Sequence, residues 1–250
     1  MARPGFCGSH LARGPRVAEQ KQEVRERMWE LLERKNATRF PGARGRIPNF
    51  RGAEHAAARL AELPEWQAAG VVKSNPDAPQ LPVRRRARKD GKKLYMAVPR
   101  LTEKKPFVEV RGDPTIKRAP AEGKALSVDE LEPVDVIVCG TVAVNRQGVR
   151  IGKGGGFSDL EFALLVERGL VNRSTTILTT VHDLQLRDEK LPETGHDFRV
   201  DVIVTPTTTV RTRARRRPSG VLWDHLDAEK LAAIPVLQGL RLTRLPPHAR

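Results

Sequence analysis

The chain has 250 residues, of which 39% are hydrophobic and 30% charged, with 45 Lys and Arg against 30 Asp and Glu. That length allows one large domain with a real core, and no run of about 18 apolar residues could cross a membrane. The net charge of +15 favours polyanionic ligands such as nucleotide phosphates, a polyglutamate tail or nucleic acid. The two cysteines, Cys7 and Cys139, lie too far apart for a zinc knuckle or a disulfide framework. We therefore expect a protein of a reducing compartment, the cytoplasm.

The first 20 residues have the composition of a tail that does not fold on its own. Residues 1–18 contain three arginines, two prolines, three glycines and no acidic residue, which leaves little apolar surface to bury. We therefore expect a disordered basic tail over residues 1–20 and a single α/β domain over residues 21–250.

The segment "KQEVRERMWELLERKN" opens this domain. Its apolar residues recur every three or four positions, which predicts an amphipathic helix over residues 21–36. Lys21 and Arg25 lie one turn apart on this helix, so their charges can converge on one anionic target.

The rest of the chain alternates between helix and strand patterns. "AEHAAARLAEL" predicts a second helix that ends before Pro64, and Ser127 and Glu130 have the spacing of a capping box. The segments that predict strands are "GVV", "KLYMAV", "FVEV", "VDVIVCG", "TTILTTV" and "VDVIVTP". Their alternation with helices predicts a three-layer α/β/α domain with a mainly parallel sheet. Ligands of such sheets bind at the carboxyl ends of the strands.

A glycine-rich loop, "GKGGG" at residues 152–156, precedes a predicted helix. Glycine allows positive φ and lets a ligand approach the backbone, and successive free N–H groups form an anion-binding concavity. Lys153 adds a full charge. The helix is expected from about Ser158 to Arg168, with Ser158 and Glu161 as a capping box. The pattern predicts a phosphate-binding loop, and the alternative is a mobile linker.

The commonest nucleotide and hydrolase motifs do not match this loop. Phe157 occupies the last glycine position of G-x-G-x-x-G, and no Walker pattern G-x-x-x-x-G-K-[ST] is present. Ser158 is not in a G-x-S-x-G elbow, so it is not expected to be a hydrolase nucleophile.

A longer stretch, "DVIVCGTVAVNRQGVRIGKGGGFSD", resembles the 5-formyltetrahydrofolate cyclo-ligase family, also called methenyltetrahydrofolate synthetases. That family carries the signature R-x-G-x-G-x-G-Y-Y-D. The matching positions here are Arg150, Gly152, Gly154, Gly156 and Asp159. In addition, "KQEVR" matches the family's N-terminal K-x-x-x-R, and "HDFRVDVIVTP" is similar to a later strand that bears an aspartate. The resemblance runs with gaps from about residue 21 to 210.

The resemblance implies a Rossmann-like sheet of the NagB/RpiA/CoA-transferase-like type and an ATP- and Mg²⁺-dependent enzyme. Such an enzyme phosphorylates the formyl oxygen of 5-formyltetrahydrofolate, and N10 attack then gives 5,10-methenyltetrahydrofolate with ADP and phosphate. The positions expected to bind ATP are Lys21, Arg25, Arg150, Gly152, Lys153, Gly154, Gly155, Gly156, Phe157 and Ser158. Of these, Lys21, Arg25 and Lys153 are also expected to act in catalysis, and Phe157 to contact substrate. Asp159 and Asp201 are expected to bind Mg²⁺. The alternatives are stabilisation of a helix start by Asp159 and a place in a strand-end turn for Asp201.

Two departures from the family pattern concern the folate. Phe157-Ser158 replaces a tyrosine pair, and Pro79-Gln80 stands where the family has a pterin-contacting glutamate. Asp77 is the nearest acidic residue. We expect the ATP chemistry to be retained and the substrate contacts to be altered, as in a divergent branch resembling the methenyltetrahydrofolate-synthetase-domain-containing and cyclo-ligase-like proteins.

Three alternative functions remain open from the sequence. The chain could be a paralogue that binds ATP elsewhere in thiamin- or folate-related metabolism, or a nucleotide-binding module without turnover. It could also bind RNA through the basic runs at 84–93 and 211–217, although 4% aromatic residues offer few stacking platforms. The partner expected first is a reduced folate or a related small molecule, bound by a monomer or a dimer.

His182-Asp183 and His196-Asp197 are interpreted as loop pairs, and "VLWDHL" as a core segment.

Overall fold

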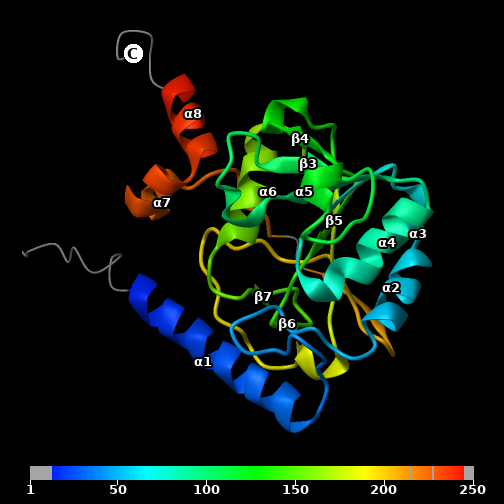
Figure 1. Ribbon diagram of the computed structural model, residues 1–250. Helices are drawn as coiled ribbons and strands as arrows, with labels where there is room; N and C mark the ends of the chain where they lie inside the picture. Colours follow the sequence, from blue (N-terminus) through cyan, green and yellow to red (C-terminus); the bar gives the residue numbers. More distant parts are fainter. Residues whose placement is uncertain (1–12, 214–215, 227, 245–250) are drawn as a thin grey trace, which may run out of the picture.

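The computed structural model describes residues 13–213, 216–226 and 228–244 (Figure 1). Helix α1 begins at Arg13, so the expectation of a disordered tail is wrong for residues 13–20. Ala, Glu and Gln in this stretch favour helix, and an existing helix extends at little cost. The rest of the expected tail, with Cys7, lies outside the described residues.

Eight strands of the described chain form the central sheet, in the order β11-β10-β8-β5-β1-β2-β3-β4. Their bounds are β1 (Val71–Ser74), β2 (Lys93–Ala97), β3 (Phe107–Glu109), β4 (Lys124–Leu126), β5 (Val136–Cys139), β8 (Thr176–Thr180), β10 (Val202–Val204) and β11 (Thr209–Arg211). The five strands from β10 to β2 are mutually parallel, and antiparallel strands occupy both edges. The predicted α/β domain with a mainly parallel sheet is confirmed.

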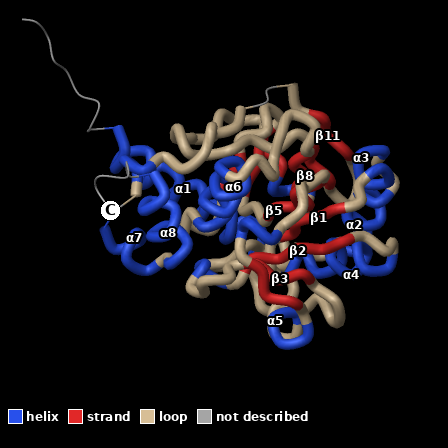
Figure 2. The backbone as a smooth tube through the Cα atoms, turned by 90° about the horizontal axis from the view of Figure 1, so that it is seen from above, coloured by secondary structure: helices blue, strands red, loops and turns tan. Residues whose placement is uncertain are grey.

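The helices cover both faces of this sheet (Figures 1 and 2). They are α1 (Arg13–Arg34), α2 (Ala53–Ala61), α3 (Pro64–Ala68), α4 (Leu81–Lys89), α5 (Ala119–Glu122), α6 (Phe157–Glu167), α7 (Ala228–Ala233) and α8 (Pro235–Arg244). Short 3-10 turns are η1 (Ala78–Gln80), η2 (Pro99–Leu101), η3 (Val128–Glu130), η4 (Asp183–Gln185) and η5 (Trp223–His225). None of the helices in the described part of the chain is long and apolar enough to span a membrane.

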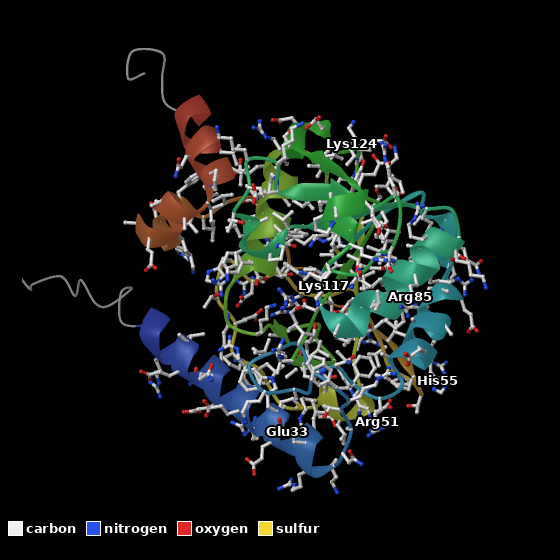
Figure 3. All side chains as sticks on the ribbon, in the orientation of Figure 1. Glu33, Arg51, His55, Arg85, Lys117 and Lys124 are labelled. Carbon is white, nitrogen blue, oxygen red and sulfur yellow. The ribbon has the colours of Figure 1, made fainter. Side chains whose placement is uncertain are left out.

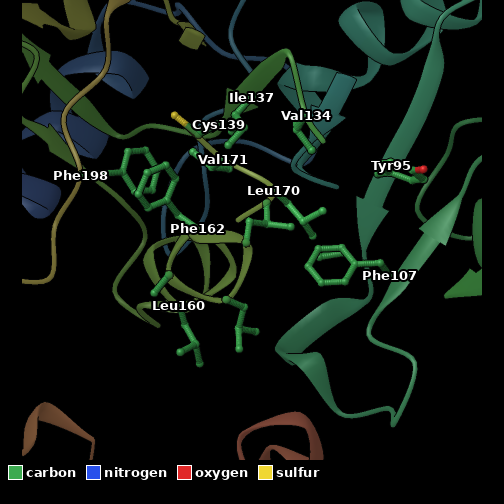
Figure 4. Packing of buried hydrophobic residues seen from close by; sticks show 14 of the residues in the cluster. Tyr95, Phe107, Val134, Ile137, Cys139, Leu160, Phe162, Leu170, Val171 and Phe198 are labelled. Carbon is green, nitrogen blue, oxygen red and sulfur yellow. The ribbon is translucent and has the colours of Figure 1, made fainter. Parts of the chain in front are cut away.

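Strand β5 shows how the sequence builds two cores. Alternate side chains of a strand point to opposite faces. Val136 and Val138 pack in one cluster with α2, α3 and α4, whereas Ile137 and Cys139 pack in the other with α6 and α8. In the second core, Phe162 of α6 lies 4.7 Å from the Phe198 ring between centroids (Figure 4). Because the strand is buried on both faces, it reads as the continuous apolar run seen in the sequence.

A second, small sheet carries the glycine loop. It consists of β6 (Ala143–Asn145), β7 (Arg150–Ile151) and β9 (Leu186–Arg187), in the order β7-β6-β9. The apolar face of α1 packs on it, with Met28 and Leu32 in one cluster with Val142 and Ile151. This packing places the polar edge of α1 beside the loop that follows β7.

Candidate functional site

The loop from Gly152 to Gly156 joins β7 to α6, which is the helix predicted to follow it. Gly154 has φ +115° and Gly156 has φ +71°, conformations that L side chains rarely adopt. Gly156 is the residue that caps α6, and no side chain caps the helix start. The predicted capping box of Ser158 and Glu161 is therefore wrong, because α6 begins one residue earlier and Glu161 is buried. The box of Ser127 and Glu130 is present at η3.

Arg25 reaches the loop from α1, whereas Lys21 of the same helix pairs with Asp197. The Nε atom of Arg25 donates a hydrogen bond to the Gly152 carbonyl oxygen at 2.7 Å, across 127 positions of the chain. Lys21 Nζ lies 2.5 Å from Asp197 Oδ2, and both side chains are largely buried. Burial lowers the pKa of Arg25, an effect that the Asp197 carboxylate opposes. The two cations thus converge on one region, as their spacing predicts.

Arg150 and Asp159 form a buried pair below the loop. Arg150 donates to Asp159 Oδ1 at 2.9 Å and to the Gly140 carbonyl oxygen at 3.2 Å, and its guanidinium lies 4.3 Å from the centroid of the Phe198 ring. Burial works against the charge, but Asp159 and other nearby anionic groups raise the pKa of Arg150. Among the described residues, the second oxygen of Asp159 has no hydrogen-bond partner.

The remaining loop side chains contact the end of β1. Lys153 Nζ lies 2.9 Å from Asp77 Oδ1, with the lysine half-exposed and the aspartate largely buried. Ser158 Oγ lies 3.4 Å from Asn75 Nδ2. Asp77, the acidic residue nearest to the altered pterin position in the sequence, therefore lies beside the loop. Gln80 from that position is fully buried, and its Nε2 lies 3.5 Å from the Thr180 carbonyl oxygen.

A cavity opens beside the loop and the start of α6. The lining residues are Gly155, Gly156, Phe157, Asp159, Leu160, Ala163, His196, Gly220, Val221, Leu222, His225, Leu226, Lys230 and Ile234. Phe157 is half-buried and lines this cavity.

Asp201 does not join this site. It precedes β10 and accepts hydrogen bonds from the backbone N–H of Ile177 at 2.8 Å and from Arg217 at 2.7 Å. Ile177 lies near the start of β8, so Asp201 sits at the amino ends of parallel strands, whereas Asp159 contacts Arg150 beside Gly140, at the carboxyl ends. The structure thus corrects the expectation that the two aspartates share one metal ion.

Residues from two further segments join the site. The sequence predicts a loop pair at His196-Asp197, but Asp197 binds Lys21 and His196 lines the cavity. The segment "VLWDHL" packs against the core, as predicted, but it also lines the same cavity. His225 Nδ1 lies 3.3 Å from His196 Nδ1. Burial lowers the pKa of His196. No local pattern indicates these positions, because only the folded chain brings them to the loop.

Replacing Asp197 by asparagine is expected to lower stability by about 1–3 kcal/mol at pH 7. Burial opposes the charge of Asp197, but Lys21 and Thr194 lower its pKa below the ordinary value. The stabilisation is therefore present above the unfolded-state pKa of about 4 and lost as the pH falls through the lower folded-state pKa. Urea unfolding at pH 7 and pH 3 measures this. An equal difference between wild type and D197N at both pH values would contradict the role of the ion pair.

The two basic runs are largely occupied by internal contacts. Arg84 is buried, and its guanidinium donates to the backbone carbonyls of Asn75, Asp77 and Pro114. Burial lowers the pKa of Arg84 to about 10. In the second run, Arg211 pairs with Glu65. Other members remain on the surface, such as Arg85 on α4 (Figure 3). The runs therefore do not form continuous strips of unpaired cations in the described chain.

A buried ion pair supports the start of α6. Lys73 of β1 donates a hydrogen bond to Glu161 Oε2, and the two side chains are 2% and 5% exposed. Asn75 Nδ2 lies 3.4 Å from the same carboxylate oxygen. The pair links the carboxyl end of β1 to the helix that follows the glycine loop.

Comparison with known proteins places the chain among relatives of the predicted kind. A methenyltetrahydrofolate synthase domain-containing protein of Mus musculus is 40% identical over 88% of this chain. One of Bos taurus is 37% identical over 91% of it. The chain spans 63% of the length of each of these relatives.

A solved structure shows the same fold. The NMR structure of Aquifex aeolicus 5,10-methenyltetrahydrofolate synthetase matches 84% of this chain and 99% of its own, with a TM-score of 0.51 and 22% identity. The profile of the 5-formyltetrahydrofolate cyclo-ligase family matches residues 17–206, a range that contains most of α1 and the whole glycine loop. The chain therefore belongs to the 5-formyltetrahydrofolate cyclo-ligase family.

Proposed function

We propose that this protein is an ATP- and Mg²⁺-dependent ligase that converts 5-formyltetrahydrofolate, or a closely related reduced cofactor, to its cyclised methenyl product. The observation that carries the proposal is the contact of Arg25 with the Gly152 carbonyl at 2.7 Å. It joins the two sequence signatures of the family, which lie far apart in the chain, into one site. We propose that residues 21–250 form one ATP-binding domain.

The glycine loop is the proposed site of the triphosphate. Phosphoryl transfer requires mainly positioning and stabilisation of negative charge. The loop supplies backbone N–H groups, and Lys21, Arg25 and Lys153 supply positive charge around it. Lys153 contacts Asp77 at 2.9 Å in this structure, so it exchanges one anionic partner for another when a phosphate binds.

The donor set around Asp159 fits a Mg²⁺ ion. Mg²⁺ prefers oxygen ligands and is usually bound by one or two carboxylates together with substrate phosphates. Asp159 lines the cavity and keeps one carboxylate oxygen without a protein partner. Among the described residues no group of three or more acidic, histidine or cysteine side chains could hold a metal ion, so nucleotide phosphates and water would supply the ligands besides Asp159. When bound, the ion would neutralise charge on the triphosphate.

The proposed reaction has two steps. The formyl oxygen of the substrate attacks the γ-phosphorus of ATP, and ADP leaves. The substrate N10 then attacks the activated formyl carbon and gives up its proton. The C–O bond breaks to release phosphate, which carries the former formyl oxygen and takes up the proton. Arg25 and Lys21 stabilise the charge that develops in the first step. The cavity beside Phe157 excludes water from the activated intermediate, which would otherwise hydrolyse.

The substrate contacts are where this chain departs from the family. Gln80 stands at the position of the pterin-contacting glutamate, and its amide side chain cannot supply a carboxylate. It is also buried against Thr180. A different reduced cofactor with a formyl group is therefore included in the proposal.

The proposal is tested by incubating the purified protein with MgATP and 5-formyltetrahydrofolate. We expect methenyltetrahydrofolate absorbance to appear only when both substrates are present. Binding of MgATP without any turnover across a panel of formyl substrates would instead identify a nucleotide-binding module. Absence of both binding and turnover would contradict the proposal.

A further inference from the structure

The cavity beside the glycine loop has two walls of different origin. One wall comes from residues 155–163 and His196, which lie inside the range matched by the family profile. The other comes from residues 220–234, beyond the end of that match at residue 206. The second wall therefore lies outside the range that the family profile matches.

Packing and a hydrogen bond fix the second wall to α6. Ile234 and Leu237 are buried in the same core cluster as Leu160, which points toward the C-terminal helices in Figure 4. The backbone N–H of Val221 donates to Glu167 Oε1 at 2.9 Å. The segment is thus seated on the same helix that begins at the loop.

Lys230 brings a positive charge from this wall to the loop. Its Nζ atom lies 3.9 Å from the position that a Cβ atom would take on Gly156, and its side chain is half-buried and lines the cavity. Arg25 approaches the loop at Gly154, with Cζ 3.6 Å from the equivalent Cβ position. Cations from α1 and α7 therefore face successive parts of one loop, and both helices lie on the same side of the molecule in Figures 1 and 2.

We propose that Lys230 binds phosphate oxygens of the nucleotide, so that the segment after the family match completes the ATP site. This rests on the proposed function, which places the triphosphate on the glycine loop. An ammonium group suits the role because it binds phosphate as a mobile point charge. The apolar residues around it, Leu222, Leu226 and Ile234, limit the water that would screen this charge.

The test measures binding of a Mg²⁺-loaded, non-hydrolysable ATP analogue, of adenosine and of 5-formyltetrahydrofolate by isothermal titration calorimetry. K230A is expected to bind the analogue about tenfold more weakly, because one charge-assisted hydrogen bond is lost. Its adenosine affinity should not change. K230R should retain most of the affinity, and K89A, which changes an exposed lysine of α4 on the other face of the sheet, should bind as wild type.

Four other outcomes would overturn the role of Lys230 in binding the nucleotide phosphates. Wild-type affinity of K230A for the ATP analogue would overturn the role of Lys230 while leaving the proposed function intact. Equal loss of analogue and adenosine binding, with unchanged thermal unfolding, would show that Lys230 only packs the cavity. A loss confined to 5-formyltetrahydrofolate would assign Lys230 to a substrate carboxylate. If wild type binds no nucleotide, the proposed function fails and the role of Lys230 fails with it.

Discussion

Replacing Lys73 by methionine is expected to lower the free energy of unfolding by about 3–5 kcal/mol, because it leaves a buried carboxylate without its cation. Lys73 and Glu161 are 2% and 5% exposed in their side chains, so water cannot take the place of the missing partner. Asn75 offers the carboxylate only one longer contact, at 3.4 Å. Chemical denaturation of wild type and K73M measures the loss.

The cause can be separated from general damage to the core. The double variant K73M/E161L removes both charges and is expected to regain most of the stability, because a well-packed apolar pair often replaces a buried ion pair at little cost. R27M is the control for an exposed pair, since Arg27 and Glu189 are 62% and 38% exposed. It should change stability by less than about 1 kcal/mol. A K73M variant as stable as R27M would show that Glu161 does not depend on Lys73.

Replacing Arg25 by methionine is expected to lower kcat/KM by about 10²–10³-fold, the usual effect of removing one donor that stabilises transition-state charge. Arg25 holds the Gly152 carbonyl and is the cation closest to Gly154. Its loss removes both a charge and an anchor of the loop. R25K should recover part of the activity, since lysine restores the charge without the planar guanidinium.

Arg27 provides the matched control for this experiment as well. It lies two positions along the same helix and is exposed, so R27M should keep wild-type turnover. Methenyltetrahydrofolate formation is followed by absorbance at saturating and limiting MgATP. If R25M is folded and turns over within threefold of R27M, Arg25 does not act on the phosphate, and the observation that carries the proposed function loses its force.

Much of the fold and of the loop could be predicted from local patterns. Apolar runs such as "VDVIVCG" mark strands buried on both faces, and the four-residue spacing of Lys21 and Arg25 places both on one edge of a helix. These features depend on neighbours in the chain, so the sequence displays them directly. The family signature then relates the helix to the loop.

The rest of the site depends on contacts between distant segments. Glu161 has the spacing of a helix cap, but its carboxylate is taken by Lys73 from a strand that lies 88 positions away. Asp201 follows the family pattern, yet it lies at the amino ends of the parallel strands. The glycine loop lies at their carboxyl ends. Lys230 and His225 belong to a segment with no motif, and only the packing of Ile234 and Leu237 onto α6 brings them to the cavity. No local periodicity carries this information.

The most direct test of the central claim, that ATP activates the formyl oxygen at the glycine loop, follows that oxygen atom. 5-Formyltetrahydrofolate labelled with ¹⁸O in the formyl group is converted with MgATP, and the released phosphate is analysed by mass spectrometry. The proposed reaction transfers the label to inorganic phosphate, one atom for each methenyltetrahydrofolate formed. Unlabelled phosphate, or ADP formation without any methenyl product, would contradict the account.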